Sequence, residues 1–166
     1  MGNTSLTSNS SKIAKLIFSL FLPLAIGGAS GSFARDEING QWFSSLAQAS
    51  YSPPNYLFGP VWTTMYLIMG ISMLLIWRAP KTDLRQKALI VFGIQLFCNF
   101  SWSMIFFTLH IIPTSVIVII LIWIIVLYTI IFFKKIYPLA AYLQTPYFFR
   151  LTYATVVNVP VWFLNK

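Results

Sequence analysis

Five long apolar runs dominate this sequence and leave little chain for anything else. Each run is long enough to cross a bilayer as an α-helix, which takes roughly 20 residues. Only 8% of the residues are charged and 58% are hydrophobic, whereas soluble domains carry roughly 25% charged residues. The runs are continuously apolar rather than alternating, which argues against a β-barrel. The sequence predicts an all-α integral membrane protein, a five-transmembrane-helix bundle, with spans at about 13–34, 56–77, 87–109, 112–133 and 138–164.

The segments outside these runs indicate one domain. Residues 1–11, "MGNTSLTSNSS", are polar, and we predict that they are disordered. Residues 12–166 then form a single five-helix transmembrane domain. The longest connection, 35–55, carries Asp36 and Glu37, and long loops of this kind often act as lids or binding loops.

The basic residues are distributed unevenly over the connections. Eight flank the start of the first run or lie in alternate connections and at their edges, and two lie on the opposite side. The positive-inside rule therefore predicts a cytoplasmic N-terminus and an outside C-terminus. The same distribution indicates that the net charge of +8 reflects basic residues at the membrane surface, near anionic lipid headgroups, and does not indicate nucleic-acid binding. The eight are Lys12, Lys15, Arg78, Lys81, Arg85, Lys87, Lys134 and Lys135, and the two are Arg35 and Lys166.

The first run allows two interpretations. Lys12 and Lys15, the apolar core "LIFSLFLPLAI" and the small-residue tail "GGASGSFA" suit a membrane span and also a cleavable secretory signal. Gly27 and Gly31 have the spacing that lets helices approach closely, either within one chain or between two chains.

Polar residues inside the later runs predict which helix faces point inward. Gln95, Asn99 and Ser103 recur every fourth residue, with Trp102 beside them, so they share one helical face. Unpartnered amides are costly in lipid. We therefore expect this face to point into the bundle, where it supplies interhelical hydrogen bonds, ligand contacts or both.

Arg150 lies close to the middle of the last run. A central arginine costs about 2.5–3.5 kcal/mol on the insertion scale, so it must face protein or water. Tyr147, Arg150, Ala154 and Asn158 fall within an arc of about 80° on a helix. No run contains a carboxylate, so the cation is satisfied either by backbone carbonyls and waters or by an anionic ligand group.

The residue types needed for catalysis are scarce. The chain has one histidine, His110, and one cysteine, Cys98, and it lacks nucleotide-binding motifs and metal-ligand clusters. We expect no catalytic residue, no metal site and no obligatory cofactor, and we interpret His110 as an ordinary interfacial residue.

Three segments together resemble the translocator protein / tryptophan-rich sensory protein (TspO/MBR) family. They are "QWFSSLAQASYSPPNYLFGPVWTTMYLIMGISMLLIWR", "QLFCNFSWSMIFFTLH" and "PYFFRLTYATVVNVPVW". The resemblance covers about residues 42–166, in order and at the family's spacing. It implies a five-helix bundle, usually dimeric, with a pocket under the first loop that binds porphyrins, sterols and synthetic benzodiazepine-type ligands.

The resemblance and the polar faces together give a set of candidate ligand-binding residues. The family motifs supply nine of them, and Tyr51, Tyr147 and Arg150 complete the set. The nine are Trp42, Pro53, Pro54, Trp62, Tyr66, Asn99, Trp102, Ala154 and Asn158.

From these features we expect a membrane receptor or sensor that binds tetrapyrroles and other lipophilic ligands. The expected partners are a porphyrin, the lipid bilayer and a second copy of the chain. A transporter of porphyrins or lipophilic molecules and a porphyrin-degrading enzyme are the alternatives. Arg150 stands where the family usually has the tryptophan tied to light-dependent porphyrin breakdown in some bacterial members, which weighs against degradation.

Overall fold

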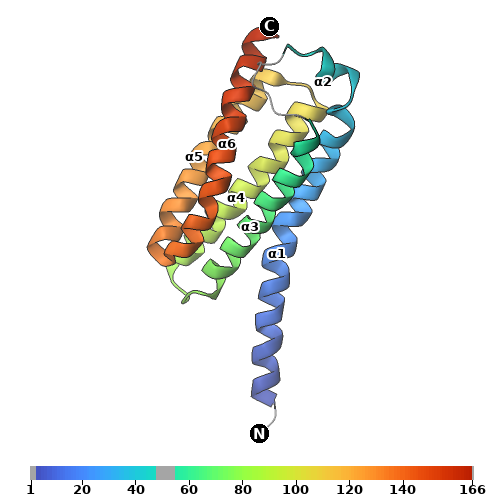
Figure 1. The fold of residues 1–166 in the computed structure, drawn as a ribbon. Helices are drawn as coiled ribbons and strands as arrows, with labels where there is room; N and C mark the ends of the chain where they lie inside the picture. The colour runs from blue at the N-terminus through green and yellow to red at the C-terminus, as the bar shows by residue number, and fades with distance from the viewer. Residues whose placement is uncertain (1–2, 48–54, 166) are drawn as a thin grey trace.

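The computed structural model describes residues 3–47 and 55–165, which are mostly helical and contain no strand. Five long helices run side by side, and the short α2 lies across one end of the bundle, near the C-terminus (Figure 1). In chain order the elements are α1 (Asn3–Glu37), α2 (Gln41–Ser45), the 3-10 turn η1 (Asn55–Leu57), α3 (Phe58–Arg78), α4 (Asp83–Ser103), the π-helical turn η2 (Met104–Thr108), α5 (Ile112–Ile136) and α6 (Pro138–Leu164).

The five apolar runs correspond to the five long helices. Four stretches among the described residues are long and apolar enough to cross a membrane: Lys12–Glu37, Gly59–Arg78, Asp83–Thr108 and Ile112–Ile136. α6 has 27 residues, but it is not one of these four. Gln144, Arg150 and Asn158 lower its mean hydropathy, so its length alone supports a fifth span.

The N-terminal segment differs from the prediction of disorder over residues 1–11. α1 begins at Asn3, and its first turns extend below the rest of the bundle (Figure 1). Residues 3–11 contain neither glycine nor proline, the two residues that interrupt helices most strongly. The helix therefore continues through a segment whose polarity had indicated disorder.

Proline and side-chain caps define where the helices begin and end. Pro60 lies in the first turn of α3, and Pro113 and Pro138 lie at the starts of α5 and α6, where a missing N–H costs little. The Thr82 hydroxyl accepts a hydrogen bond from the Arg85 backbone N–H and caps α4. The Arg85 guanidinium donates to the carbonyls of Trp77 and Ala79 at the end of α3. These bonds fix the tight α3–α4 connection.

Each long helix packs against at least two others. α1 packs on α3 and α4, α5 packs on α4 and α6, and α3 packs on α6. Glycines allow the closest approach between α1 and α3. A Cβ at Gly27 would lie 2.4 Å from the Tyr66 ring, and one at Gly70 would lie 2.8 Å from the Ser19 carbonyl oxygen. Gly27 thus makes a helix contact within one chain, which is one of the two alternatives that its spacing to Gly31 allowed.

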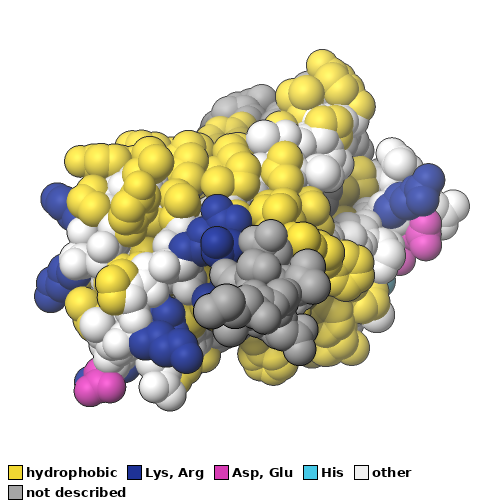
Figure 2. Space-filling view, turned by 90° about the horizontal axis from the view of Figure 1, so that it is seen from below, with side chains coloured by type: hydrophobic (Ala, Val, Ile, Leu, Met, Phe, Trp, Pro, Cys, Tyr) yellow, Lys and Arg dark blue, Asp and Glu magenta, His cyan; other side chains and the backbone are white. Residues whose placement is uncertain are grey.

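The outer surface combines apolar sides with a basic end. Large apolar side chains are exposed on α4, α5 and α6, among them Phe97, Ile117 and Phe149, as lipid-facing helices require. The α3–α4 connection and the α5–α6 turn lie at the end from which α1 extends (Figure 1). Seen from that end, Lys and Arg side chains stand beside a broad apolar surface (Figure 2). Basic connections therefore gather at one end of the bundle.

Candidate ligand-binding site

Four of the predicted site residues line one small cavity inside the bundle. Trp62 and Tyr66 come from α3, and Asn99 and Trp102 come from α4. Gly27, Ser30 and Gly31 of α1 and Ser103 of α4 complete the lining. The cavity has a volume of about 30 Å³, which is room for one or two water molecules.

Asn99, which lines this cavity, is hydrogen-bonded to Tyr147 behind it. The Tyr147 hydroxyl donates to Asn99 Oδ1, with 2.5 Å between the oxygens. Asn99 Nδ2 donates to the Gln95 carbonyl. Gln95, Asn99 and Ser103 are all buried, which confirms that this face of α4 points inward. The Ser103 hydroxyl donates to the Ser30 carbonyl and joins α4 to α1, so part of the face supplies interhelical hydrogen bonds.

A Tyr147→Phe substitution should lower the free energy of unfolding by about 1 kcal/mol, because Asn99 Oδ1 loses its donor while it stays buried. Thermal unfolding of the purified protein in detergent measures this loss. Tyr142→Phe on the same helix is the matched control, since Tyr142 is 61% exposed. An equal effect of both substitutions would show that the Tyr147 hydroxyl stabilises nothing.

Arg150 lies against aromatic rings, as its position in an apolar run requires. Its guanidinium carbon is 5.2 Å from the ring centroid of Trp62 and 5.3 Å from that of Tyr153. Both distances suit cation–π contacts. Among the described residues no carboxylate lies within salt-bridge distance of it. Trp62 also makes an edge contact with Tyr147. The Arg150 guanidinium, the Trp62 and Tyr147 rings and the Asn99 amide are therefore in contact one after another.

Ala154 and Asn158 face the bundle one and two turns beyond Arg150. Both are buried, as the shared helical face predicted, although neither lines the small cavity. Asn158 Nδ2 donates to the Ala154 carbonyl. Asn158 Oδ1 and Trp102 Nε1 are among the buried polar atoms that have no hydrogen-bond partner within the described residues. One accepts and the other donates a hydrogen bond, so both can serve a bound polar group.

The lid segment, residues 38–47, covers the end of the bundle. Trp42 stacks on His110, with 3.8 Å between ring centroids, and meets Phe106 edge-on. The lid is also tied to the end of α6, because the Asn165 side chain exchanges two hydrogen bonds with the backbone of Ala47. Trp42 is therefore a lid residue and does not line the small cavity. The predicted site residues Tyr51, Pro53 and Pro54 lie outside the described residues.

His110 is the feature that the sequence interpretation missed. It lies in the α4–α5 connection with a φ of 57°, two residues after the end of the π-helical turn η2. Its Nε2 is 3.6 Å from Glu37 Oε2. His110 thus joins the end of α1, the lid and the α4–α5 connection through one ring. The single histidine at the end of an apolar run was the only sequence signal for this role, and spacing alone could not pair it with Glu37 or Trp42.

The fold and the site define a class of protein: a helical membrane protein with an aromatic cavity between its helices and a lid over one end. The TspO/MBR family model matches residues 19–163. This chain belongs to the TspO/MBR family.

Individual relatives agree with this assignment. The chain is 34% identical over 154 residues to the tryptophan-rich protein TspO of Archaeoglobus fulgidus, which covers 92% of this chain and 98% of that protein. It is 33% identical over 146 residues to protein CrtK of Rhodobacter capsulatus, covering 87% and 89%. It is 31% identical over 125 residues to the human translocator protein, covering 74% and 73%. Together with the four apolar helices, the family identifies a multi-pass membrane protein.

Proposed function

We propose that this chain is a membrane receptor or sensor that binds a tetrapyrrole such as protoporphyrin inside the helix bundle. The observation that carries the proposal is the Arg150 cation, which lies against Trp62 beside the aromatic cavity without a carboxylate partner among the described residues. The proposal includes α6 as a fifth membrane span, a cytoplasmic N-terminus, a single domain over residues 12–166 and assembly as a homodimer. The name of one relative, the tryptophan-rich sensory protein of Cereibacter sphaeroides, fits a sensor.

The chemistry of the site suits a flat apolar ring system with acidic substituents. Trp62 and Trp102 offer aromatic faces for stacking. The Arg150 guanidinium can form a charge-assisted hydrogen bond with a propionate. Trp102 Nε1 and Asn158 Oδ1 add a buried donor and a buried acceptor that lack partners in the described structure. Other lipophilic ligands could use the same aromatic faces without the contact to Arg150.

Binding requires the site to widen. Pockets for drug-sized ligands measure roughly 300–1,000 Å³, whereas the small cavity measures about 30 Å³. The lid and the Trp62 side chain are the parts whose movement would enlarge it. The lid is held by ring contacts of Trp42 and Phe43 with His110, Phe106 and Phe107, and by two hydrogen bonds between Asn165 and Ala47. Its opening therefore breaks several contacts at once. We therefore expect ligand binding to be slow and to depend on lid opening.

Titration of the full-length protein with protoporphyrin tests the proposal. Changes in porphyrin absorbance report binding without relying on tryptophan fluorescence, so Trp62 variants remain measurable. Arg150→Gln should weaken binding about tenfold, because it removes a charge-assisted contact in a half-exposed site. Trp62→Ala should weaken it further, because it removes the stacking face and the ring against which Arg150 rests.

Arg78→Gln is the matched control for Arg150→Gln. It removes the same charge from the exposed end of α3, away from the site, and should leave the affinity unchanged. Equal affinities in the native protein, Arg150→Gln and Trp62→Ala would disprove the assigned site. Absence of any saturable binding would disprove the function as a tetrapyrrole receptor.

A further inference from the structure

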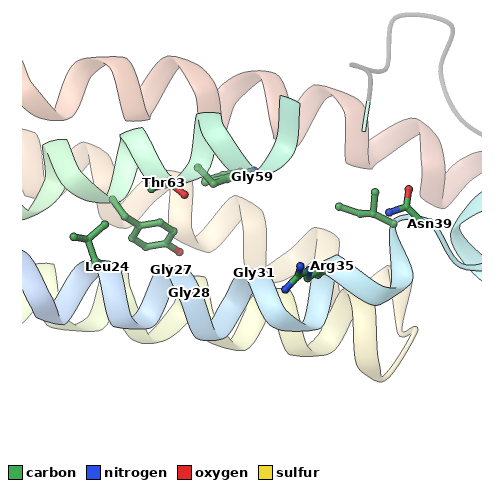
Figure 3. Close-up of a pocket in the computed structure, with 11 residues that line it drawn as sticks. Leu24, Gly27, Gly28, Gly31, Arg35, Asn39, Gly59 and Thr63 are labelled. Carbon is green, nitrogen blue, oxygen red and sulfur yellow. The ribbon is translucent and has the colours of Figure 1, made fainter. Parts of the chain in front are cut away.

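A second, larger cavity lies between α1 and α3, on the other side of the Trp62–Tyr66 wall. Its volume is about 470 Å³. Leu24 and three glycines of α1 line one side, and Gly59, Trp62, Thr63 and Tyr66 of α3 line the other. Figure 3 shows these residues along the two facing helices, with Arg35 and Asn39 toward one end. We call this cavity the α1–α3 groove.

Missing side chains create the groove. A Cβ built at Gly28, Gly31 or Gly59 would meet nothing within 4 Å, although all three residues line the cavity. Gly27 differs, because a Cβ there would collide with the Tyr66 ring. One glycine therefore brings α1 and α3 together, and the other three keep space open beside that contact. Any larger residue at Gly28 or Gly31 would project into the space.

The groove has one charged end. Arg35 lies in the last turn of α1 and is the only charged residue among the described residues that line the groove. Its carboxylate neighbour Glu37 contacts His110, and no carboxylate within the described ranges is in salt-bridge distance of Arg35. The rest of the lining is apolar or uncharged. An occupant that matches this surface has a negative group at one end and an apolar body.

We propose that the α1–α3 groove binds an anionic phospholipid, with its phosphate at Arg35 and one acyl chain along Gly31, Gly28 and Leu24. The groove lies between two helices that are apolar and long enough to span a bilayer, so lipid is the apolar partner always present there. A basic residue at the end of a span attracts anionic headgroups. A second copy of the chain would have to insert a side chain into the groove, and its charge would have to complement Arg35.

The two cavities share a wall. Gly27, Gly31, Trp62 and Tyr66 line both of them. A bound acyl chain therefore contacts the outer side of the wall, and a ligand in the bundle contacts the inner side. The lipid site does not rest on tetrapyrrole binding, because its lining does not include Arg150, Asn99 or Trp102.

Native mass spectrometry of the purified full-length protein tests this site, with phosphatidylglycerol and phosphatidylcholine of identical chains as probes. We expect one tight phosphatidylglycerol adduct per chain and weaker phosphatidylcholine binding. Gly31→Leu should abolish the tight adduct, because its side chain fills the groove. Arg35→Gln should weaken phosphatidylglycerol binding about fivefold and remove the preference over phosphatidylcholine, since one interfacial charge contributes about 1 kcal/mol.

Matched controls separate the groove from the general surface. Gly93→Leu places the same side chain on α4, where a Cβ also meets nothing within 4 Å, and Arg78→Gln removes a charge outside the groove. Both should keep the adduct. Gly28→Leu repeats the blocking test if Gly31→Leu does not fold. Retention of the adduct in both glycine variants, or an unchanged headgroup preference in Arg35→Gln, overturns the proposal. It is also overturned if Gly31→Leu abolishes a dimer and leaves lipid binding intact.

Discussion

A Gly70→Val variant is expected to lose about 3 kcal/mol of its free energy of unfolding, at the upper end of what overpacking costs in a core. A Cβ at Gly70 would lie 2.8 Å from the Ser19 carbonyl oxygen and 3.1 Å from the Leu20 Cα. Both atoms belong to the backbone of α1, so neither can move without displacing the helix. α1 must shift outward, and its contact with α3 weakens along its length.

Thermal unfolding in detergent, followed by circular dichroism, measures this loss. Gly93→Val is the control, because it has the same helix propensity cost at an exposed position with open space around it. Gly27→Ala tests the kind of neighbour. Its Cβ would meet the ring of Tyr66, which can rotate, so its cost should be smaller than that of Gly70→Val. Equal unfolding temperatures for Gly70→Val and Gly93→Val would contradict the backbone contact.

The helices and their inward faces could be predicted from the sequence because both depend on local patterns. A span needs only length and apolar composition, and the five runs gave the helix bounds to within a few residues, except for the start of α1, which lies ten residues earlier at Asn3. The polar face of α4 follows from a spacing of four residues, so Gln95, Asn99 and Ser103 were placed correctly. Arg150 had to avoid lipid, and the structure places it against protein.

The pairings across helices could not be predicted, because they depend on how separate elements pack. The sequence required Arg150 to face protein or water but did not indicate that Trp62 would be its partner. The spacing of Gly27 and Gly31 predicted a close helix–helix contact at both glycines, whereas the structure shows the contact at Gly27 and open space beside Gly31. Polarity alone suggested disorder for residues 3–11, where α1 continues. The residues next to His110 in the sequence did not indicate its contacts, which are with Glu37 of α1 and Trp42 of α2.

His110→Ala should release the lid without unfolding the bundle. The substitution removes the stack on Trp42, which is worth about 0.5–1.5 kcal/mol, and the partly exposed pair with Glu37, worth about 0.2–1 kcal/mol. The lid should therefore open about tenfold more often. Hydrogen exchange of peptides that cover residues 38–47 measures the opening, and peptides from α5 report any global change. Leu109→Ala, an exposed neighbour, is the control.

His110→Gly separates the side chain from the backbone. His110 has a φ of 57°, a left-handed conformation that costs a residue with a Cβ about 1–2 kcal/mol and that glycine adopts freely. His110→Gly loses the same ring contacts as His110→Ala but is relieved of this cost. Lid exchange should therefore increase less in His110→Gly than in His110→Ala. Trp42→Ala should also increase lid exchange, because it removes the stack from the other side together with the edge contact to Phe106. If exchange over residues 38–47 is unchanged in His110→Ala, the ring does not hold the lid. In that case the lid is held by the contacts of Trp42 and Phe43 with Phe106 and Phe107 and by the Asn165 hydrogen bonds to Ala47.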